Sequence, residues 1–496
     1  MFLRTPLKPD QKKAAKFTCS RFGALVSYGT GTGKGYIQIV TSLYLIKHDK
    51  VDKFIFVCTK SGGVEIVSEF EKHTNVIPVF LSSKEDFITF MDGEEKVAVF
   101  EYNAFERMVL ISDPSKSSKR KKMLDKLAMS RLFTYIKQQR VGVCFDEVHK
   151  LMKPSSRTTK FFRYLRKSFK FRFGFTATPI MSDLYNIFNI VEMLSPGKLG
   201  TWKEFTDNYM VRFQLEYVQK GKNGKPIFID GEPKMVKRWE VSRYKNLDDL
   251  SEQLEEVMIR YFPEGEVTYI NHKVELEEDL RKEYILAARG VLESADEDEK
   301  KSHSARIIDL QRIVDSSLNK QNAFLKVVKE HLDQGLLVYG AFYDTIDILK
   351  RILDVEGIEH KEITGRVSSR EERREIRDWF IEDPKKKVLL LSTAGGQSLN
   401  LQATPHLIFY NIPFGIGYYI QILGRVVREF SLFDAFFIHS IVTLDSIDIY
   451  KYNYIYMHRV DFERVVKNTL EEKTKRRFQG FNAYLLKELR KSLLWK

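Results

Sequence analysis

Two short strings in the first third of the chain hold the residue types that bind and hydrolyse a nucleoside triphosphate. The first is a glycine-rich turn with a lysine, Gly29-Thr30-Gly31-Thr32-Gly33-Lys34-Gly35. Glycines let backbone N–H groups close around a phosphate, the following helix presents its positive N-terminus, and the lysine can reach the β and γ phosphates. Taken alone, the turn is just as typical of an ordinary connection between a strand and a helix.

The second string is a pair of acids after an apolar run, Asp146-Glu147-Val148-His149. At the end of a strand, Asp146 can hold Mg²⁺ through its water shell, and Glu147 can orient and deprotonate the water that attacks the γ phosphate. Two acids at such a place can also simply begin a helix. Asp146 stands 112 positions after the lysine of the glycine-rich turn. Because the two strings occur together, they favour ATP hydrolysis, with Mg²⁺ as the cofactor.

Both strings follow short apolar runs, and similar runs recur along the chain with helical segments between them. They occupy residues 22–27, 53–58, 96–101, 141–147 and 171–178 in the first half, and 336–342, 387–393, 406–411 and 435–442 in the second. Continuous apolar strands that alternate with helices are typical of parallel sheets covered on both faces. The sequence therefore predicts an α/β protein with two doubly wound lobes, over residues 1–262 and 263–444.

Three further segments interrupt or extend this pattern. Residues 211–241 have alternating strand character around an Asn223-Gly224 turn, which predicts a β-hairpin inserted in the first lobe. Residues 276–333 are helical in pattern, with a charged break at 294–304 that suits a solvated connection. Residues 445–496 are rich in tyrosine, lysine and arginine, and predict a basic helical C-terminal extension.

Composition limits the class of protein. A chain of 496 residues is too long for a single core and suits two large domains. No apolar run reaches the roughly 18 residues that span a bilayer, the N-terminus has no secretory signal, and the three cysteines lack the pairing of a zinc site. We therefore expect a cytoplasmic protein that is neither secreted nor bound to a membrane. The net charge of +14 suits a polyanionic partner, but equally suits a need for solubility.

The motifs, taken in order, resemble the motor core of superfamily-2 helicases, and within it the Swi/Snf-type translocases. The resemblance begins with Asp146-Glu147-Val148-His149 and Thr176-Ala177-Thr178-Pro179, and extends over most of residues 7–200 and 336–430. It implies two RecA-like lobes that bind ATP and DNA. Residues 58–70 resemble motif Ia of the group, 172–200 the stretch around motif III, 389–403 motif V and 421–428 motif VI.

The resemblance also implies a role for each candidate residue. In catalysis these are Lys34, Asp146, Glu147, and the arginine fingers Arg425 and Arg428, which in the family reach across the cleft to the triphosphate. ATP binding would involve Gln11, which stands where the family's glutamine reads adenine, and Gly29, Thr30, Gly31, Thr32, Gly33, Lys34, Gly35 and Gln421. Coupling of ATP hydrolysis to movement would involve His149, Thr176 and Thr178. Sequence-independent contacts with DNA phosphates would involve Thr59, Lys60, Ser61, Thr393 and Asn400.

Two departures from the family pattern affect these expectations. The loop lysine is normally followed by Thr or Ser, whose hydroxyl binds Mg²⁺ directly, but the next residue here is Gly35. Loss of one polar ligand costs about 1 to 3 kcal/mol. We therefore predict a working ATPase with weakened metal affinity. Motif V is one residue shorter than usual and has Ser398 in place of a glycine, which affects its DNA contacts.

The leading functional hypothesis is a DNA translocase, monomeric on DNA, that remodels branched DNA by fork regression, branch migration or annealing in replication, recombination or repair. Compact phage-encoded helicases of the branch-migration type resemble such a bare motor, and a phage protein would act in the host cytoplasm. The hairpin at 211–241 is a candidate strand-separating element. Two alternatives stay open: a translocase that strips proteins from duplex DNA without unwinding it, and a weakly hydrolysing DNA-binding regulator of transcription or replication. The basic run 116–122 is either a duplex contact or a solvated loop.

Overall fold

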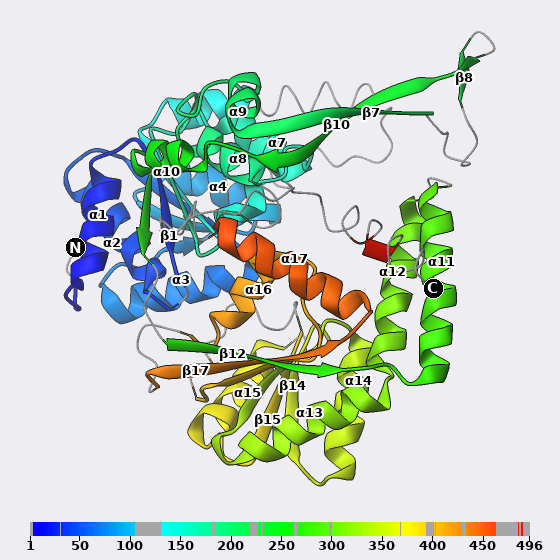
Figure 1. Cartoon of the computed structure of the whole chain (residues 1–496). Coiled ribbons are helices and arrows are strands. Elements are labelled where there is room, and N and C mark those ends of the chain that lie inside the picture. Colours follow the sequence, from blue (N-terminus) through cyan, green and yellow to red (C-terminus); the bar gives the residue numbers. More distant parts are fainter. Residues whose placement is uncertain are drawn as a thin grey trace. The chain divides into compact units, whose positions relative to one another are not determined.

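The chain forms two α/β units, each of which has its own parallel sheet (Figure 1). The first unit contains residues 1–205 and 248–263, and the second contains 206–247 and 264–464. The computed structural model describes residues 3–29, 31–104, 130–180, 184–218, 227–229, 232–261, 266–296, 300–367, 369–392, 401, 403–427, 433–462, 485 and 488–489. Several residues named above lie outside the described ones: Thr30, the run 116–122, the hairpin tip 219–226, Thr393, Ser398, Asn400, Arg428 and nearly all of 463–496.

Seven strands form the first sheet in the order β11-β1-β6-β5-β2-β4-β3, and all neighbours are parallel. Its central strands are buried along nearly their whole length, as continuous apolar runs predict. The strands are β1 (Gly23–Tyr28), β2 (Lys53–Cys58), β3 (Val79–Phe80), β4 (Val97–Glu101), β5 (Val141–Asp146), β6 (Phe171–Thr176) and β11 (Met258–Tyr261).

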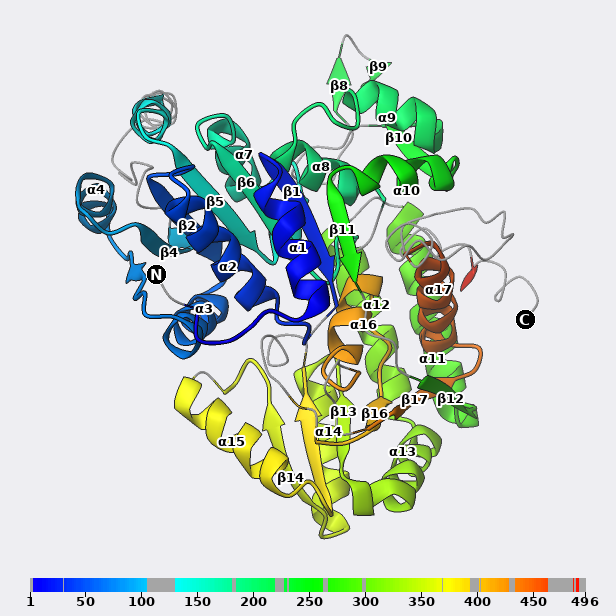
Figure 2. The ribbon, with the colours of Figure 1, turned by 90° about the vertical axis from the view of Figure 1, so that its left-hand side faces the viewer.

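Helices pack on both faces of the first sheet, and Figure 2 shows α1 and α2 lying across its strands. On one face, alternate strand residues such as Val26 and Phe56 join a core with α1, α2 and α3. On the other face, the Phe145 ring lies 5.2 Å from that of Phe162 in α7, and α8 approaches Gly174 so closely that a Cβ would come within 2.8 Å of Leu194. The helices are α1 (Pro9–Cys19), α2 (Lys34–Lys47), α3 (Lys60–His73), α4 (Lys84–Asp92), α7 (Arg157–Leu165), α8 (Tyr185–Leu194), α9 (Trp202–Tyr209) and α10 (Leu247–Glu255), with the 3₁₀ turn η1 (Val148–Leu151).

The second sheet has six parallel strands in the order β12-β17-β16-β13-β15-β14. Its core joins β13, β15 and β16 to α13 and α14. The strands are β12 (Glu266–Val274), β13 (Leu336–Tyr339), β14 (Glu359–Ile363), β15 (Lys387–Leu391), β16 (His406–Phe409) and β17 (Ala435–Thr443). The helices are α11 (Glu278–Asp296), α12 (Lys300–Asp315), α13 (Leu318–His331), α14 (Tyr343–Val355), α15 (Arg370–Glu382), α16 (Ile416–Leu423) and α17 (Ile447–Phe462), with η2 (Leu332–Gln334).

The predicted hairpin insertion is an antiparallel ribbon of β7 (Met210–Val218) and β10 (Met235–Tyr244), which is long and narrow in Figure 1. A short pair, β8 (Phe228–Ile229) and β9 (Glu232–Pro233), lies between them in sequence. Neither described strand of the ribbon pairs with one of the large sheets. The segment 206–247 groups with the second unit, whereas the sequence places the hairpin in the first lobe. Because the described strands of the ribbon form no strand-pairing hydrogen bonds with either sheet, their position along the chain does not determine to which unit the ribbon belongs. The predicted fold class, two doubly wound parallel-sheet lobes with a hairpin insertion, is confirmed.

A cluster of buried charged side chains joins the helices of the second unit. Lys320 in α13 forms ion pairs with Asp448 at 2.6 Å and with Asp315 at 3.0 Å, and the three side chains are at most 2% exposed. Further hydrogen bonds to the two carboxylates come from Gln311, Thr345 and Asn411. The cluster thus connects α12, α13, α14, α17 and the segment after β16.

A row of histidines crosses the second sheet. His272 Nε2 lies 3.1 Å from His439 Nδ1, and His439 Nε2 lies 3.2 Å from His406 Nδ1. Burial, with a contribution from the nearby His331, lowers the pKa of His406 to about 4 and that of His439 to about 3. Nitrogens of His331, His406 and His439 lie within 4.8 Å of one another. However, both ring nitrogens of His406 already lie 3.2 Å from another polar atom, one in His439 and one in Gln334.

We expect this row to make the second unit sensitive to acid. The pKa values of His406 and His439 are lower in the folded protein than the ordinary 6.5. Their contribution to the free energy of unfolding is therefore complete above pH 6.5 and is lost as pH falls towards 4 and 3. In this pH range each group lowers the free energy of unfolding by roughly 1.4 kcal/mol per pH unit, because the unfolded chain binds the proton first. Urea unfolding at pH 7.5, 6 and 5 measures the slope.

The matched variants are a double substitution, His406→Gln with His439→Gln, and His48→Gln at an exposed histidine of the first unit. The double variant should depend less steeply on pH than the wild type, and His48→Gln should follow the wild type. Equal slopes for the double variant and the wild type would assign the acid sensitivity to other groups.

Among the residues that the structure describes, no helix is long and apolar enough to cross a bilayer.

Candidate nucleotide-binding site

Four neighbouring strands of the first sheet end at one edge, because β1, β6, β5 and β2 are parallel and adjacent. The residues at these ends are the ones that the sequence singles out. The glycine-rich turn follows β1, Asp146 ends β5, Thr176 ends β6, and Thr59 follows β2. The fold of the first unit alone therefore brings the first-lobe candidates to one edge.

The glycine-rich turn needs its glycines for conformation and for space. Gly31 and Gly33 have φ values of +78° and +75°, in the left-handed region that favours glycine. A Cβ on Gly33 would lie 2.5 Å from Nε2 of Gln11. The Gln11 side chain is buried against the turn, where it donates to the Thr32 carbonyl at 3.2 Å and accepts from the Lys8 N–H at 3.1 Å. Its role in reading adenine stays a prediction.

Lys34 begins α2, and its ammonium is held over the turn. Nζ donates to the carbonyls of Tyr28 at 3.0 Å and Gly29 at 2.8 Å. Anionic phosphate oxygens are stronger acceptors for the same donor. The other end of the turn is fixed to the edge strand β11, where the Gly29 N–H donates to the Tyr261 carbonyl at 2.7 Å.

Asp146 lies among polar groups from several elements. Burial, followed by the charge of Glu147, raises the pKa of Asp146 to about 7, against an opposing hydrogen bond from Gln38. That bond joins Gln38 Nε2 to Asp146 Oδ1 at 2.9 Å, and the Tyr102 hydroxyl donates to the Asp146 carbonyl at 2.7 Å. At the start of α3, the missing side chain of Gly62 leaves space beside Asp146, because a Cβ there would lie 3.1 Å from Oδ2.

Glu147, His149 and Thr176 form one polar group beside Asp146. His149 Nδ1 lies 2.9 Å from Thr176 Oγ1 and 3.2 Å from Glu147 Oε2. The Thr178 N–H donates to the same Thr176 hydroxyl at 3.0 Å. Glu147 has a φ of +49°, which is uncommon for a residue with a side chain and marks local strain. Two of the residues predicted to couple hydrolysis to movement, His149 and Thr176, thus contact the acid predicted to activate water, and Thr178 contacts Thr176.

The residues at this edge fit a magnesium ion. Mg²⁺ prefers oxygen ligands and usually takes only one or two carboxylates from a protein, as Asp146 offers here. A divalent cation would also favour the ionised form of Asp146, whose pKa burial raises. A second oxygen, Oε1 of Gln38, is buried without a hydrogen-bond partner among the described residues.

The predicted DNA contacts of motif Ia lie at the N-terminus of α3. Thr59 caps this helix, since its hydroxyl accepts from the Gly62 N–H at 3.1 Å. Lys60 is exposed, and Ser61 is in the first turn of the helix. A helix N-terminus favours anions, so the place suits a phosphate, and the contacts themselves stay a prediction.

In the second unit, the described motif VI residues lie at the end of α16. Gln421 is within the helix, Gly424 is its C-cap, and Arg425 follows with 8% exposure. Their roles towards the triphosphate stay predictions.

Gln38 and Tyr102 are absent from the sequence-based site. The signal for Gln38 was its place one turn after Lys34, where residues four apart share a helix face, inside the otherwise apolar run Tyr36–Val40. Nothing in the sequence connects Tyr102 with Asp146.

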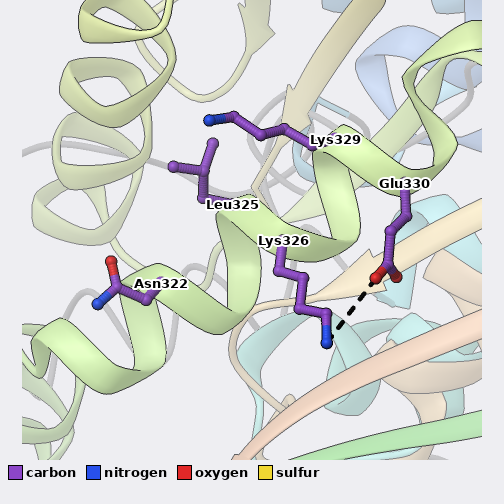
Figure 3. Close-up of a pocket in the computed structure, with 5 residues that line it drawn as sticks. All are labelled: Asn322, Leu325, Lys326, Lys329 and Glu330. Carbon is purple, nitrogen blue, oxygen red and sulfur yellow. Dashed lines mark ion pairs between the residues drawn. The ribbon is translucent and has the colours of Figure 1, made fainter.

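A surface depression on α13 has no such chemistry. It is lined by Asn322, Leu325, Lys326, Lys329 and Glu330, all from this one helix of the second unit (Figure 3). Lys326 and Glu330 form an ion pair across one helical turn, at 3.9 Å. The other lining groups do not form a catalytic or metal-binding set.

Two family models match the chain. The one described as "Type III restriction enzyme, res subunit" matches residues 4–181, and the one described as "Helicase conserved C-terminal domain" matches residues 319–429. The first range contains every first-unit candidate named above. The second contains Gln421 and Arg425.

Among similar proteins, an uncharacterised ATP-dependent helicase of Bacillus subtilis, YqhH, is 23% identical over 69% of this chain and 63% of its own length. The DNA repair and recombination protein RDH54 of Saccharomyces cerevisiae is 21% identical over 67% of this chain and 36% of its own length. The chain thus spans less than two thirds of these relatives. Among solved structures, the Sulfolobus solfataricus SWI2/SNF2 ATPase core in complex with dsDNA is 17% identical over 94% of both chains, with a TM-score of 0.40.

Proposed function

We propose that this chain is a superfamily-2 helicase with a Swi/Snf-like motor core, and that it hydrolyses ATP to move along DNA. The observation that carries the proposal is the edge of the first sheet, where Lys34 follows β1 and Asp146 and Glu147 lie at the end of β5, with only β6 between the two strands. The two family matches, one in each unit, support it, and the match in the second unit is to a helicase C-terminal domain. So do relatives with names that include an ATP-dependent helicase and a DNA repair and recombination protein.

In this proposal each residue of the edge has one task. Lys34 leaves the carbonyls of Tyr28 and Gly29 and binds the β and γ phosphates, because an ammonium prefers the more anionic acceptor. Asp146 holds magnesium, which neutralises charge on the triphosphate. Glu147 orients the attacking water and accepts its proton. Arg425, which lies in the second unit after α16, keeps as a prediction the arginine-finger role that the resemblance implies.

The polar contacts around His149 connect the hydrolysis step to the segment after β6. Glu147 becomes neutral when it accepts the proton, so its electrostatic attraction to His149, 3.2 Å away, becomes weaker. His149 also contacts Thr176, and through it the Thr178 N–H, at the start of motif III. A change in the charge of Glu147 therefore affects the segment after β6 through two hydrogen bonds.

For the DNA substrate we propose a duplex with branches, on which a monomer carries out fork regression, branch migration or annealing. The β7–β10 ribbon supports this choice, because it presents Trp239 with 58% and Phe213 with 38% of their surface exposed. The Arg212 guanidinium lies 5.3 Å from the Trp239 ring centroid. Exposed aromatic rings stack on unpaired bases, and the neighbouring cation suits a phosphate backbone.

The test compares ATP hydrolysis without DNA and with single-stranded, duplex and four-way-junction DNA, and then follows conversion of the junction. Duplex and junction should both stimulate hydrolysis, and the junction should be resolved into duplexes. Trp239→Ala should slow junction conversion by about 10-fold, a typical value for one lost stacking contact, and change duplex-stimulated hydrolysis less than about 2-fold. Phe22→Ala, at an exposed phenylalanine of the first unit, is the matched control.

The outcomes separate the candidate functions. If no DNA stimulates hydrolysis, the proposal of a DNA motor is wrong. If duplex DNA stimulates hydrolysis and junctions persist, the branched-DNA role is wrong and displacement of proteins from duplex DNA becomes the better assignment. In the first case, a protein that still binds DNA while hydrolysis stays slow would be better assigned as a DNA-binding regulator.

A further inference from the structure

The residue after the loop lysine raises a structural question about the metal site. A hydroxyl at this place binds Mg²⁺ in phosphate loops of this type, and Gly35 has none. Packing does not require the glycine. A Cβ on Gly35 would make only ordinary contacts, 3.7 Å from Glu69 Cγ and 3.7 Å from Ile66 Cδ1, and its φ is not in the left-handed region.

One helical turn further on, Gln38 points its side chain at the metal-binding acid. It is 1% exposed, and its Nε2 donates to Asp146 Oδ1 at 2.9 Å. Its Oε1 is buried and has no hydrogen-bond partner among the described residues. Leaving a buried amide oxygen unpaired is unfavourable, so such an atom in a folded protein needs an explanation.

The orientation of the Gln38 amide is fixed by its neighbour. The amide nitrogen faces Asp146, since Nε2 donates to Oδ1 at 2.9 Å, and a carboxylate that binds a cation only accepts hydrogen bonds. Its oxygen then has to find a different partner, which must be a hydrogen-bond donor or a cation. Amide oxygens are hard ligands of the kind that magnesium and its bound waters accept.

We propose that Gln38 supplies the oxygen to the magnesium site that Gly35 lacks, while its amide nitrogen holds Asp146 in place. The inference rests on the proposed function, because the magnesium ion accompanies the nucleotide. It adds a residue, Gln38, that the motif pattern does not mark. It also revises the consequence of Gly35: the metal affinity is restored in part from the same helix.

The experiment measures how much Mg²⁺ the full-length protein needs to bind a fluorescent ADP analogue, with parallel titrations in EDTA. Gln38→Met keeps the length of the side chain and removes both polar atoms. It should raise the half-saturating Mg²⁺ concentration by about 10-fold and leave metal-free binding within 2-fold. Gln38→Asn, which keeps the amide but shortens its reach, should act in the same direction and replaces Gln38→Met if that variant does not fold.

Rescue by the missing hydroxyl separates metal ligation from a structural role. Gly35→Thr has space for its Cβ, and in the Gln38→Met background it should return the Mg²⁺ requirement to within about 3-fold of the wild type. In the wild-type background the same change should have a smaller effect, because Gln38 already fills the role. Gln138→Met, at an exposed glutamine of the first unit, is the control.

Three results would overturn the inference. The first is an unchanged Mg²⁺ requirement in Gln38→Met. The second is an equal loss of binding with and without metal, which would assign Gln38 a purely structural role. The third is failure of Gly35→Thr to restore the requirement. If the wild type itself binds no nucleotide under any condition, the proposed ATPase function fails as well, and this outcome is distinct from the other three.

Discussion

Replacing Glu147 with glutamine is expected to lower the rate constant of ATP hydrolysis by about 10² to 10⁴-fold while the protein still binds ATP. The amide has the size of the carboxylate and can remain beside His149 and Thr176, which lie 3.2 and 3.4 Å from Oε2. It cannot accept the proton of the attacking water. Phosphate release at saturating ATP and duplex DNA measures the rate, and binding of a fluorescent ATP analogue measures the affinity.

Glu71→Gln provides the matched control for this experiment, because it makes the same chemical change at an exposed position of α3. Its hydrolysis rate should stay within about 2-fold of the wild type, as is usual for surface substitutions away from a site. A loss of less than 10-fold in Glu147→Gln would show that another group takes the proton. An equal loss of ATP binding would place Glu147 in binding instead.

Replacing Lys320 with methionine is expected to destabilise the second unit by about 3 to 5 kcal/mol, the usual effect of removing one partner from a buried ion pair. The change removes the cation that pairs with Asp315 and Asp448 in a place where neither has more than 2% exposure. The buried Lys451 remains nearby, but its Nζ makes no hydrogen bond to either carboxylate among the described residues. Their other hydrogen bonds cannot compensate for two adjacent negative charges. Urea unfolding, followed by fluorescence and circular dichroism, measures the shift.

The control for this second prediction is Lys326→Met on the same helix, at a lysine side chain that is 76% exposed. Its ion pair with Glu330 is long and solvated, so its loss should change stability by at most about 0.5 kcal/mol. A further variant, Lys320→Met with Asp448→Asn, removes one of the two stranded charges. It should regain part of the lost stability, and no recovery at all would contradict the charge argument.

The strands that the sequence predicted are those with continuous apolar runs. All nine runs became strands, since burial on both faces leaves no polar position to obscure the pattern. The edge strands β12 and β14 were missed because exposed residues alternate with less exposed ones along them. β11 is only four residues long and pairs with β1 from more than 200 positions away, a pairing that local pattern cannot indicate.

The candidate site divides in the same way. The glycine-rich turn, Asp146 and Glu147 were found because the chemistry requires these residue types next to strand ends. Gln38 was missed because its partner Asp146 is 108 positions away, and only the hydrogen bond between α2 and the end of β5 places it in the site. The buried Lys320 was missed for a related reason, since lysines are mostly exposed and its acidic partner Asp448 is 128 positions away.

The hydrogen bond from the Gly29 N–H to the Tyr261 carbonyl links the glycine-rich turn to the edge strand β11. Tyr261 is the last residue of the first sheet, and only four residues separate it from β12, the first strand of the second sheet. The first residue of the glycine-rich turn is therefore bound to the last residue of the edge strand, which the β1–β11 ladder also holds in place. A change in the conformation of the turn has to break this hydrogen bond or move the end of β11 with it.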